Sequence, residues 1–268
     1  MVPSGAGLHY LFDRGGTSAG SGSGPSSAAG RCVVCLASLG RPVSDLDPLA
    51  AAARRAGWSS ISVELPGVAP SPLPADGSDL HDLAGGVAVA IESAAEGSPM
   101  VVVIGHAFGN RVARCLAADR PDLVGGLVLL GCGGLIPGDS SARAALARCF
   151  EVPASEESHL DDVREAFFAP GNDPSVWADG WYAEAAHAQA AAVAATSTQD
   201  WWLPPAPIRV LAVVGAEDRI SPPANARSLV ESLGERGRMV IVPRAGHALI
   251  PEQETEVTSA LVSFLDSL

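Results

Sequence analysis

The sequence predicts an α/β fold in which a mostly parallel central sheet is flanked by helices and a helical cap is inserted before the last strands. From Arg31 to Gly131, short apolar runs rich in β-branched residues alternate with amphipathic segments. This alternation is typical of parallel strands joined by crossover helices. The rhythm stops after Pro137 and resumes at Ile208. A hydrophobic content of 47% with only 5% aromatic residues suits a large buried sheet.

The predicted strands are continuous apolar runs, as expected where helices cover both faces of a sheet. They span residues 8–12, 32–37, 59–65, 100–104, 123–131, 208–215 and 238–243, and the predicted helices span 46–56, 80–95, 108–116, 222–233 and 252–268. The glycine- and serine-rich stretch 15–30 has too little apolar surface to fold alone, so we expect a mobile loop there.

Three segments follow from this pattern. Residues 1–137 form the first part of the core, residues 138–204 the helical cap and residues 205–268 the last part of the core. The cap segment is helical in composition, contains no convincing strand and holds four of the five tryptophans, Trp177, Trp181, Trp201 and Trp202.

The charge argues against two classes of partner. The formal net charge is -13, and all 17 basic residues are arginines. Nucleic acids and anionic membranes both need a basic face, so we expect neither as a partner. No apolar run reaches the roughly 18 residues of a membrane span, and the first ten residues lack a signal-peptide pattern. We therefore expect a cytoplasmic protein with a small-molecule substrate. The alanine-, glycine- and arginine-rich composition is associated with bacterial specialised metabolism.

Cys32 and Cys35 have the C-x-x-C spacing of redox and zinc sites. They lie in an apolar run predicted to be a strand, where positions three apart point to opposite faces. We interpret them as small buried hydrophobic residues. No phosphate-binding loop, metal cluster or flavin motif is present, so no cofactor is implied.

The central motif is Gly105-His106-Ala107-Phe108-Gly109, between a predicted strand and helix. It has the frame of the Gly-x-Ser-x-Gly nucleophile elbow, with Ala107 at the nucleophile position. The glycines suit a turn so tight that a Cβ would clash. An ordinary glycine turn between a strand and a helix is the alternative.

Two further loops follow predicted strands. Asp218 comes just after residues 208–215, and His247 just after residues 238–243. Ligands bind beyond the carboxyl ends of such strands. An aspartate that bonds one histidine nitrogen leaves the other nitrogen free as a general base. The alternatives are a turn aspartate capping the helix at Pro222 and a surface histidine.

The ordered set GHAFG, GAEDRISP and AGHALIPE resembles the α/β-hydrolase superfamily over nearly the whole chain, in a bacterial branch with alanine at the elbow. The resemblance implies the α/β-hydrolase fold, with His247 as the catalytic histidine and Asp218 as its orienting acid. Ala107 is then either natural or an engineered replacement of serine. Acyl-enzyme chemistry through residue 107 is excluded in both cases.

The resemblance also implies an oxyanion hole formed by the backbone N–H groups of Leu39 and Phe108. Many relatives have His-Gly where this chain has Ala37-Ser38. The Ser38 hydroxyl could donate to the oxyanion, act as a displaced nucleophile or bond its own loop.

Trp201, Trp202 and His106 are further candidates to border the substrate pocket, although His106 usually points away in such frames. We expect one tryptophan to face the pocket, the alternative being that both only bury the cap. Asn110 and Arg111 are expected to satisfy the turn and to lie on the surface. The loop 167–174 has no assigned role.

Three function classes remain open. The first is hydrolysis of a small hydrophobic ester, lactone or epoxide by water that His247 and Asp218 activate. The second is a lyase, cyclase or isomerase in which His247 abstracts a proton, and the third is a non-catalytic ligand-binding relative. A serine esterase inactivated by an engineered change at residue 107 is a variant of the first.

Overall fold

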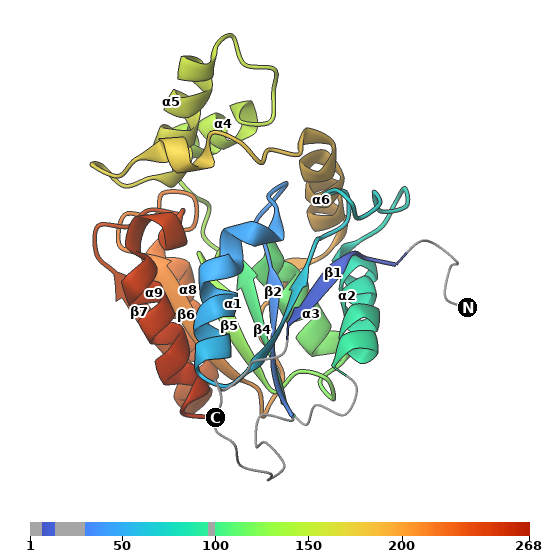
Figure 1. Ribbon diagram of the computed structural model, residues 1–268. Coiled ribbons are helices and arrows are strands. Elements are labelled where there is room, and N and C mark those ends of the chain that lie inside the picture. The colour runs from blue at the N-terminus through green and yellow to red at the C-terminus, as the bar shows by residue number, and fades with distance from the viewer. Residues whose placement is uncertain (1–6, 14–29, 96–99) are drawn as a thin grey trace, which may run out of the picture.

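The computed structural model describes residues 7–13, 30–95 and 100–268 (Figure 1). Its centre is a seven-stranded sheet in the order β1-β3-β2-β4-β5-β6-β7. Only the edge pair β1–β3 is antiparallel, and the five other neighbouring pairs are parallel. The prediction of a mostly parallel sheet is therefore confirmed. The strands are β1 (Tyr10–Asp13), β2 (Arg31–Leu36), β3 (Ser59–Val63), β4 (Met100–His106), β5 (Gly126–Leu130), β6 (Arg209–Gly215) and β7 (Gly237–Val242).

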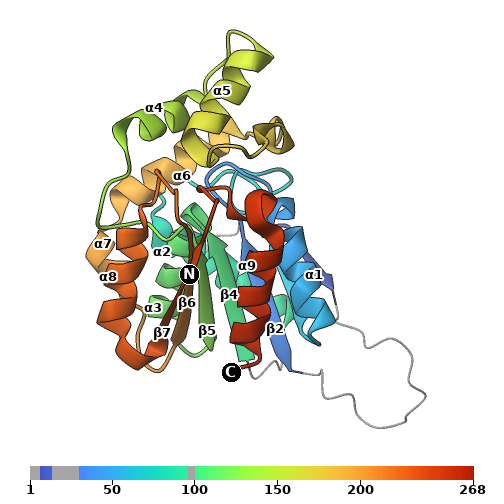
Figure 2. The same cartoon turned by 90° about the vertical axis from the view of Figure 1, so that its left-hand side faces the viewer.

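Helices cover both faces of the sheet (Figure 2). The apolar side chains of the central strands alternate between two separate cores because successive residues of a strand point to opposite faces. Cys32 belongs to one core and Cys35 to the other, as their spacing predicts. One face is covered by α2 (Leu80–Ala94), α3 (Phe108–Asp119) and α8 (Pro223–Leu233), the other by α1 (Asp47–Arg55) and α9 (Leu249–Leu265).

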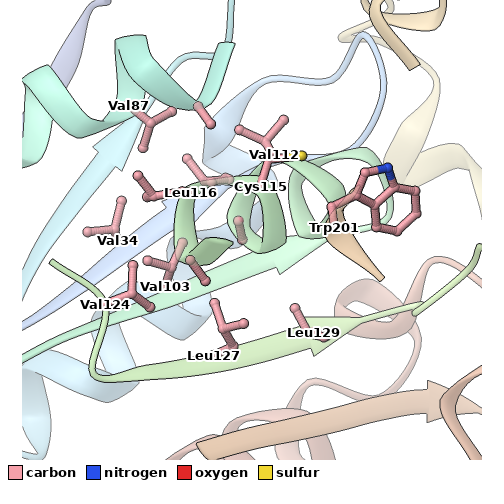
Figure 3. Packing of buried hydrophobic residues seen from close by; sticks show 14 of the residues in the cluster. Val34, Val87, Val103, Val112, Cys115, Leu116, Val124, Leu127, Leu129 and Trp201 are labelled. Carbon is pink, nitrogen blue, oxygen red and sulfur yellow. The ribbon is translucent and has the colours of Figure 1, made fainter. Parts of the chain in front are cut away.

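Helix α3 is held against the sheet by a stripe of apolar residues. Val112, Cys115 and Leu116 recur at the spacing of one helical face, and they pack with Val103 and Leu127 of the sheet (Figure 3). Each fully buried side chain of this size contributes roughly 1.5–3 kcal/mol. The helix that follows the elbow is therefore fixed firmly relative to β4.

The segment between β5 and β6 lies beyond the carboxyl ends of the strands, at the top of Figure 1. Asp139 and Ser155 cap its first two helices by accepting hydrogen bonds from backbone N–H groups. All residues of this segment are described, and none of them forms a strand. The division at residues 137 and 204 remains a prediction. The segment contains α4 (Ser140–Arg148), α5 (Glu156–Phe167), the 3-10 helix η2 (Pro174–Trp177), α6 (Ala183–Ala195) and α7 (Thr198–Trp201).

Most predicted elements are present with small shifts at their ends. The helix predicted at 46–56 is preceded by a 3-10 helix, η1 (Val43–Leu46). The last helix is interrupted by a kink at Gln253, whose φ of -146° and ψ of 58° are not helical. A single turn from Leu249, which tolerates Pro251 because no intrahelical N–H bond is lost there, therefore precedes the main helix, and the predicted start at 252 lies next to the kink. The loop predicted at 15–30 lies, apart from Gly30, outside the described residues. Within the described ranges, no helix is both long and apolar enough to cross a bilayer.

Candidate active site

The turn between β4 and α3 has the backbone of a nucleophile elbow. Ala107 has φ 48° and ψ -101°, a conformation that costs a non-glycine residue roughly 1–3 kcal/mol. A Cβ on Gly105 would lie 2.5 Å from the Asn110 backbone, and one on Gly109 would lie 2.2 Å from the Leu36 carbonyl oxygen. Both glycines are therefore required by close backbone approach. The strained central position presents a methyl group.

Asp218 and His247 form a buried pair. Oδ2 of Asp218 lies 2.8 Å from Nδ1 of His247, and their side chains are 0% and 2% exposed. Since an ionised carboxylate only accepts hydrogen bonds, Nδ1 carries the proton and donates it. Oδ1 of Asp218 accepts from the backbone N–H groups of Ile220 and Ser221, at 3.0 and 2.7 Å. Asp218 thus both orders its own turn and orients the histidine.

The His247 loop is fastened to the cap. The Phe167 carbonyl accepts hydrogen bonds from the N–H groups of His247 and Ala248, at 2.7 and 3.0 Å. The Glu252 carboxylate accepts from Gly246 N–H and from Ala169 N–H, both at 2.7 Å. The start of the 167–174 loop, to which the sequence assigned no role, therefore holds the histidine in place.

His106 holds the backbone of the His247 loop. Its Nε2 donates to the carbonyl oxygen of His247 at 2.9 Å, and the two rings lie 5.1 Å apart. Burial lowers the pKa of His106 to about 3, so the ring is neutral. Its Nδ1 is buried and has no hydrogen-bond partner among the described residues. His106 does not line the cavity; it is a positioning residue for the His247 backbone.

The two expected oxyanion donors meet at one place. Neither Leu39 N–H nor Phe108 N–H has an acceptor within the part of the chain that the structure describes. Phe108 opens α3, where N–H groups lack intrahelical partners. Leu39 lies in a tight turn closed by the Arg41 N–H bond to the Ser38 carbonyl, at 3.2 Å. Both residues line one cavity together with Ala107.

This cavity has a volume of about 180 Å³ and is lined mainly by apolar residues. Its polar groups include His247 and the hydroxyls of Ser38 and Ser221. Within the described ranges neither hydroxyl has a hydrogen-bond partner, so the alternative that Ser38 bonds its own loop is not realised. The lining consists of Ser38, Leu39, Ala107, Phe108, Arg111, Gly131, Gly133, Leu146, Phe167, Ala190, Val193, Ile220, Ser221 and His247.

Trp201 and Trp202 are absent from this lining, contrary to expectation. Both pack against the buried Arg114 guanidinium, whose carbon lies 4.5 and 5.2 Å from the centroids of the Trp201 and Trp202 rings. Arg114 donates to Asn110 Oδ1 and to the Gly133 carbonyl, at 2.8 and 2.9 Å. Both indoles therefore contact this cation and do not line the cavity. Trp201 lies beside α3 in Figure 3.

Asn110 and Arg111 also differ from expectation. Asn110 is fully buried and donates to the Leu130 carbonyl at 3.2 Å. Arg111 is half-buried and lines the cavity. It lies in the first turn of α3, four positions after Ala107, the residue that precedes the helix. That spacing is the signal that could have identified Arg111 from the sequence.

Comparison with known proteins identifies the family and the fold. The sequence profile of the alpha/beta hydrolase family matches residues 30–260. No curated protein matches the chain.

Several solved structures share the fold at low sequence identity. A putative non-heme bromoperoxidase, BpoC, from Mycobacterium tuberculosis is 20% identical with a TM-score of 0.76, over 98% of this chain and 96% of that one. The esterase EaEST from Exiguobacterium antarcticum is 18% identical with a TM-score of 0.75, over 97% and 95%. The esterase RhEst1 from Rhodococcus sp. is 19% identical with a TM-score of 0.73, over 97% and 96%. With its elbow turn, its sheet order and a family profile matched over most of its length, the chain belongs to the alpha/beta hydrolase family.

Proposed function

We propose that this protein is a cofactor-independent enzyme that hydrolyses a small, largely apolar ester, lactone or epoxide with water activated by His247. The main support is the buried Asp218–His247 hydrogen bond of 2.8 Å beside a cavity in which a methyl group, that of Ala107, occupies the nucleophile position. His247 is an oriented base, and residue 107 offers no hydroxyl for it to deprotonate. Water is therefore the simplest proton donor for His247.

For an ester, the proposed reaction runs in two steps. Nε2 of His247 takes a proton from water as the water oxygen attacks the carbonyl carbon, and Asp218 stabilises the imidazolium. The carbonyl oxygen gains the negative charge and accepts hydrogen bonds from Leu39 N–H and Phe108 N–H. The C–O bond to the alcohol then breaks, and the imidazolium returns its proton to the leaving oxygen.

Proton abstraction from carbon is the second candidate. The N–H groups of Leu39 and Phe108, which have no acceptor among the described residues, favour it, because two donors beside a base stabilise an enolate without any nucleophile. In this reaction His247 removes a proton next to a carbonyl group, and the same imidazolium returns it at another position or to a leaving group.

The proposal is tested by measuring turnover of aryl esters, lactones and epoxides by the parent, His247→Gln and Asp218→Asn. We expect activity on at least one class, with a loss of about 10³-fold or more in each variant. Activity that survives His247→Gln would contradict the proposal. Deuterium uptake from D₂O into a bound ketone, dependent on His247 and without hydrolysis, would favour the second candidate.

Ala107→Ser separates a reshaped site from a silenced serine hydrolase. If the variant reacts with a fluorophosphonate at residue 107 and gains esterase activity that the parent lacks, the protein is a serine hydrolase that lacks only its nucleophile. If the variant does not react, the site is built around the alanine. If neither turnover nor proton exchange is detected, the remaining function is that of a non-catalytic ligand-binding protein.

A further inference from the structure

The cavity is lined by one arginine, Arg111, whose guanidinium group has no polar partner among the described residues. Arg111 lines the cavity, and among the described residues it has neither a hydrogen bond nor an ion pair. Its guanidinium carbon lies 5.6 Å from the centroid of the Trp201 ring. This cation–π contact holds one face of the guanidinium but supplies no negative charge to balance it. Five other described arginines also have no polar protein partner, but all are exposed and solvated by water; they are Arg31, Arg55, Arg143, Arg227 and Arg244.

The surroundings of Arg111 increase the need for a counter-ion. Arg114 stacks on the same Trp201 ring at 4.5 Å, so two cations lie against one indole. Carbonyl oxygens and the Asn110 side chain satisfy Arg114, whereas nothing described satisfies Arg111. Burial and then the charge of Arg114 lower the pKa of Arg111, although an arginine stays protonated at neutral pH. Five of the six buried or half-buried arginines in the described ranges have polar partners, which are carboxylates for three of them, and Arg111 is the exception. A half-buried cation without a partner is costly.

The geometry points to a carboxylate as the missing partner: we infer that the substrate is a small apolar acid whose carboxylate binds Arg111 while its reacting carbonyl group faces His247. Arg111 lies in the first turn of α3, which begins directly after Ala107, and both residues line the cavity. Side chains on a helix lean toward its N-terminus, which brings Arg111 toward the elbow end of the cavity. A single guanidinium presents a planar pair of donors that matches a carboxylate in a bidentate arrangement. A doubly charged phosphate would need further donors of this kind.

The inference rests on the proposed function for the position of the reacting group, but the carboxylate site can be tested by binding alone. Cavities of about 150 Å³ hold a benzene ring, so benzoate and its neutral isostere benzamide are suitable probes for this cavity of about 180 Å³. Both dissociation constants would be measured by calorimetry at pH 7.5 for the parent, Arg111→Met, Arg111→Lys and the control Arg227→Gln.

We expect the parent and Arg227→Gln to bind benzoate at least tenfold more tightly than benzamide. Arg111→Met should lose this preference while its benzamide affinity changes less than about threefold, which shows that the cavity is intact, and Arg111→Lys should keep part of the preference. Equal binding of the two probes by the parent, binding of neither, or a preference that survives in Arg111→Met would overturn the inference.

His247→Gln separates this inference from the proposed function. It should abolish turnover yet keep the benzoate preference, because His247 and Arg111 come from different elements. A benzoate preference without any His247-dependent turnover would refute the proposed function and leave the carboxylate site standing. Turnover of neutral esters without any benzoate preference would refute the carboxylate site and leave the proposed function standing.

Discussion

The side chain of Gln189 joins α6 of the cap to the loop that carries the Leu39 amide. Its Oε1 accepts a hydrogen bond from Gly40 N–H at 2.9 Å, and its Nε2 donates to the Pro66 carbonyl at 2.9 Å. Gln189 is completely buried. The turn that carries one expected oxyanion donor is therefore held at Gly40 by a residue 149 positions further along the chain.

Gln189→Leu should destabilise the protein and reduce turnover. The change leaves Gly40 N–H and the Pro66 carbonyl without a partner, at about 1–3 kcal/mol for each buried group. We expect a loss of about 2–4 kcal/mol in the free energy of unfolding by urea, together with a lower kcat for any substrate that uses the Leu39 amide. Gln199→Leu, at an exposed position of α7, should change the stability by less than about 0.5 kcal/mol. Equal effects of the two changes would contradict this role of Gln189.

His106 should make the fold less stable in acid. Its pKa in the folded protein is about 3, below the ordinary value of about 6.5 expected for the unfolded chain. The unfolded chain therefore binds a proton below about pH 6.5 that the folded protein does not bind until about pH 3. Stability from the neutral ring is present above pH 6.5 and declines as the pH falls through this window.

His106→Gln keeps an N–H donor for the His247 carbonyl and removes the titrating ring. Between pH 7 and 5 the parent should lose about 2 kcal/mol more in its free energy of unfolding than this variant. Urea titrations at both pH values measure the difference, and the exposed His187→Gln serves as the control. Parallel losses in parent and His106→Gln would refute the prediction.

The cysteines should be inert in the native protein. All five are buried and free, and burial raises the pKa of both Cys32 and Cys35 to about 12. Because the thiolate is the reactive form, we expect almost no reaction with a thiol reagent at pH 8 and full reaction of five thiols in denaturant. Rapid reaction of a native thiol, or a Cys32–Cys35 disulfide under mild oxidation, would contradict the buried assignment.

Two glycine-to-alanine changes should have opposite effects. At Gly109 the new Cβ would lie 2.2 Å from the Leu36 carbonyl oxygen and 2.6 Å from that of Ala37, so the backbone must move. We expect a loss of about 3 kcal/mol or more, or failure to fold. At Gly85, which is exposed in α2 with no atom within 4 Å of the new Cβ, alanine should stabilise the helix by about 1 kcal/mol. If the melting temperatures of Gly109→Ala and Gly85→Ala change in the same direction, the close approach of Gly109 to the Leu36 carbonyl oxygen is contradicted.

Local chemistry made much of this protein predictable. The apolar strands and amphipathic helices follow from periodicity, and the elbow from two glycines that must lie against backbone. Asp218 and His247 were identified because the carboxyl ends of parallel strands converge, so two loops far apart in the sequence had to meet. The opposite faces of Cys32 and Cys35 follow from the two-residue repeat of a strand.

The tertiary structure alone decided which cap and helix side chains reach the cavity. Nine of the thirteen residues of helix α6 are alanines, so no stripe of large apolar residues marks its inner face, and Gln189 sets that face through contacts with distant loops. Arginines are ordinarily exposed, so nothing local indicates that Arg114 is buried by carbonyl oxygens and stacks on Trp201 and Trp202. Neither indole lines the cavity, whereas Arg111 does, because contacts between segments remote in the sequence determine which side chains meet.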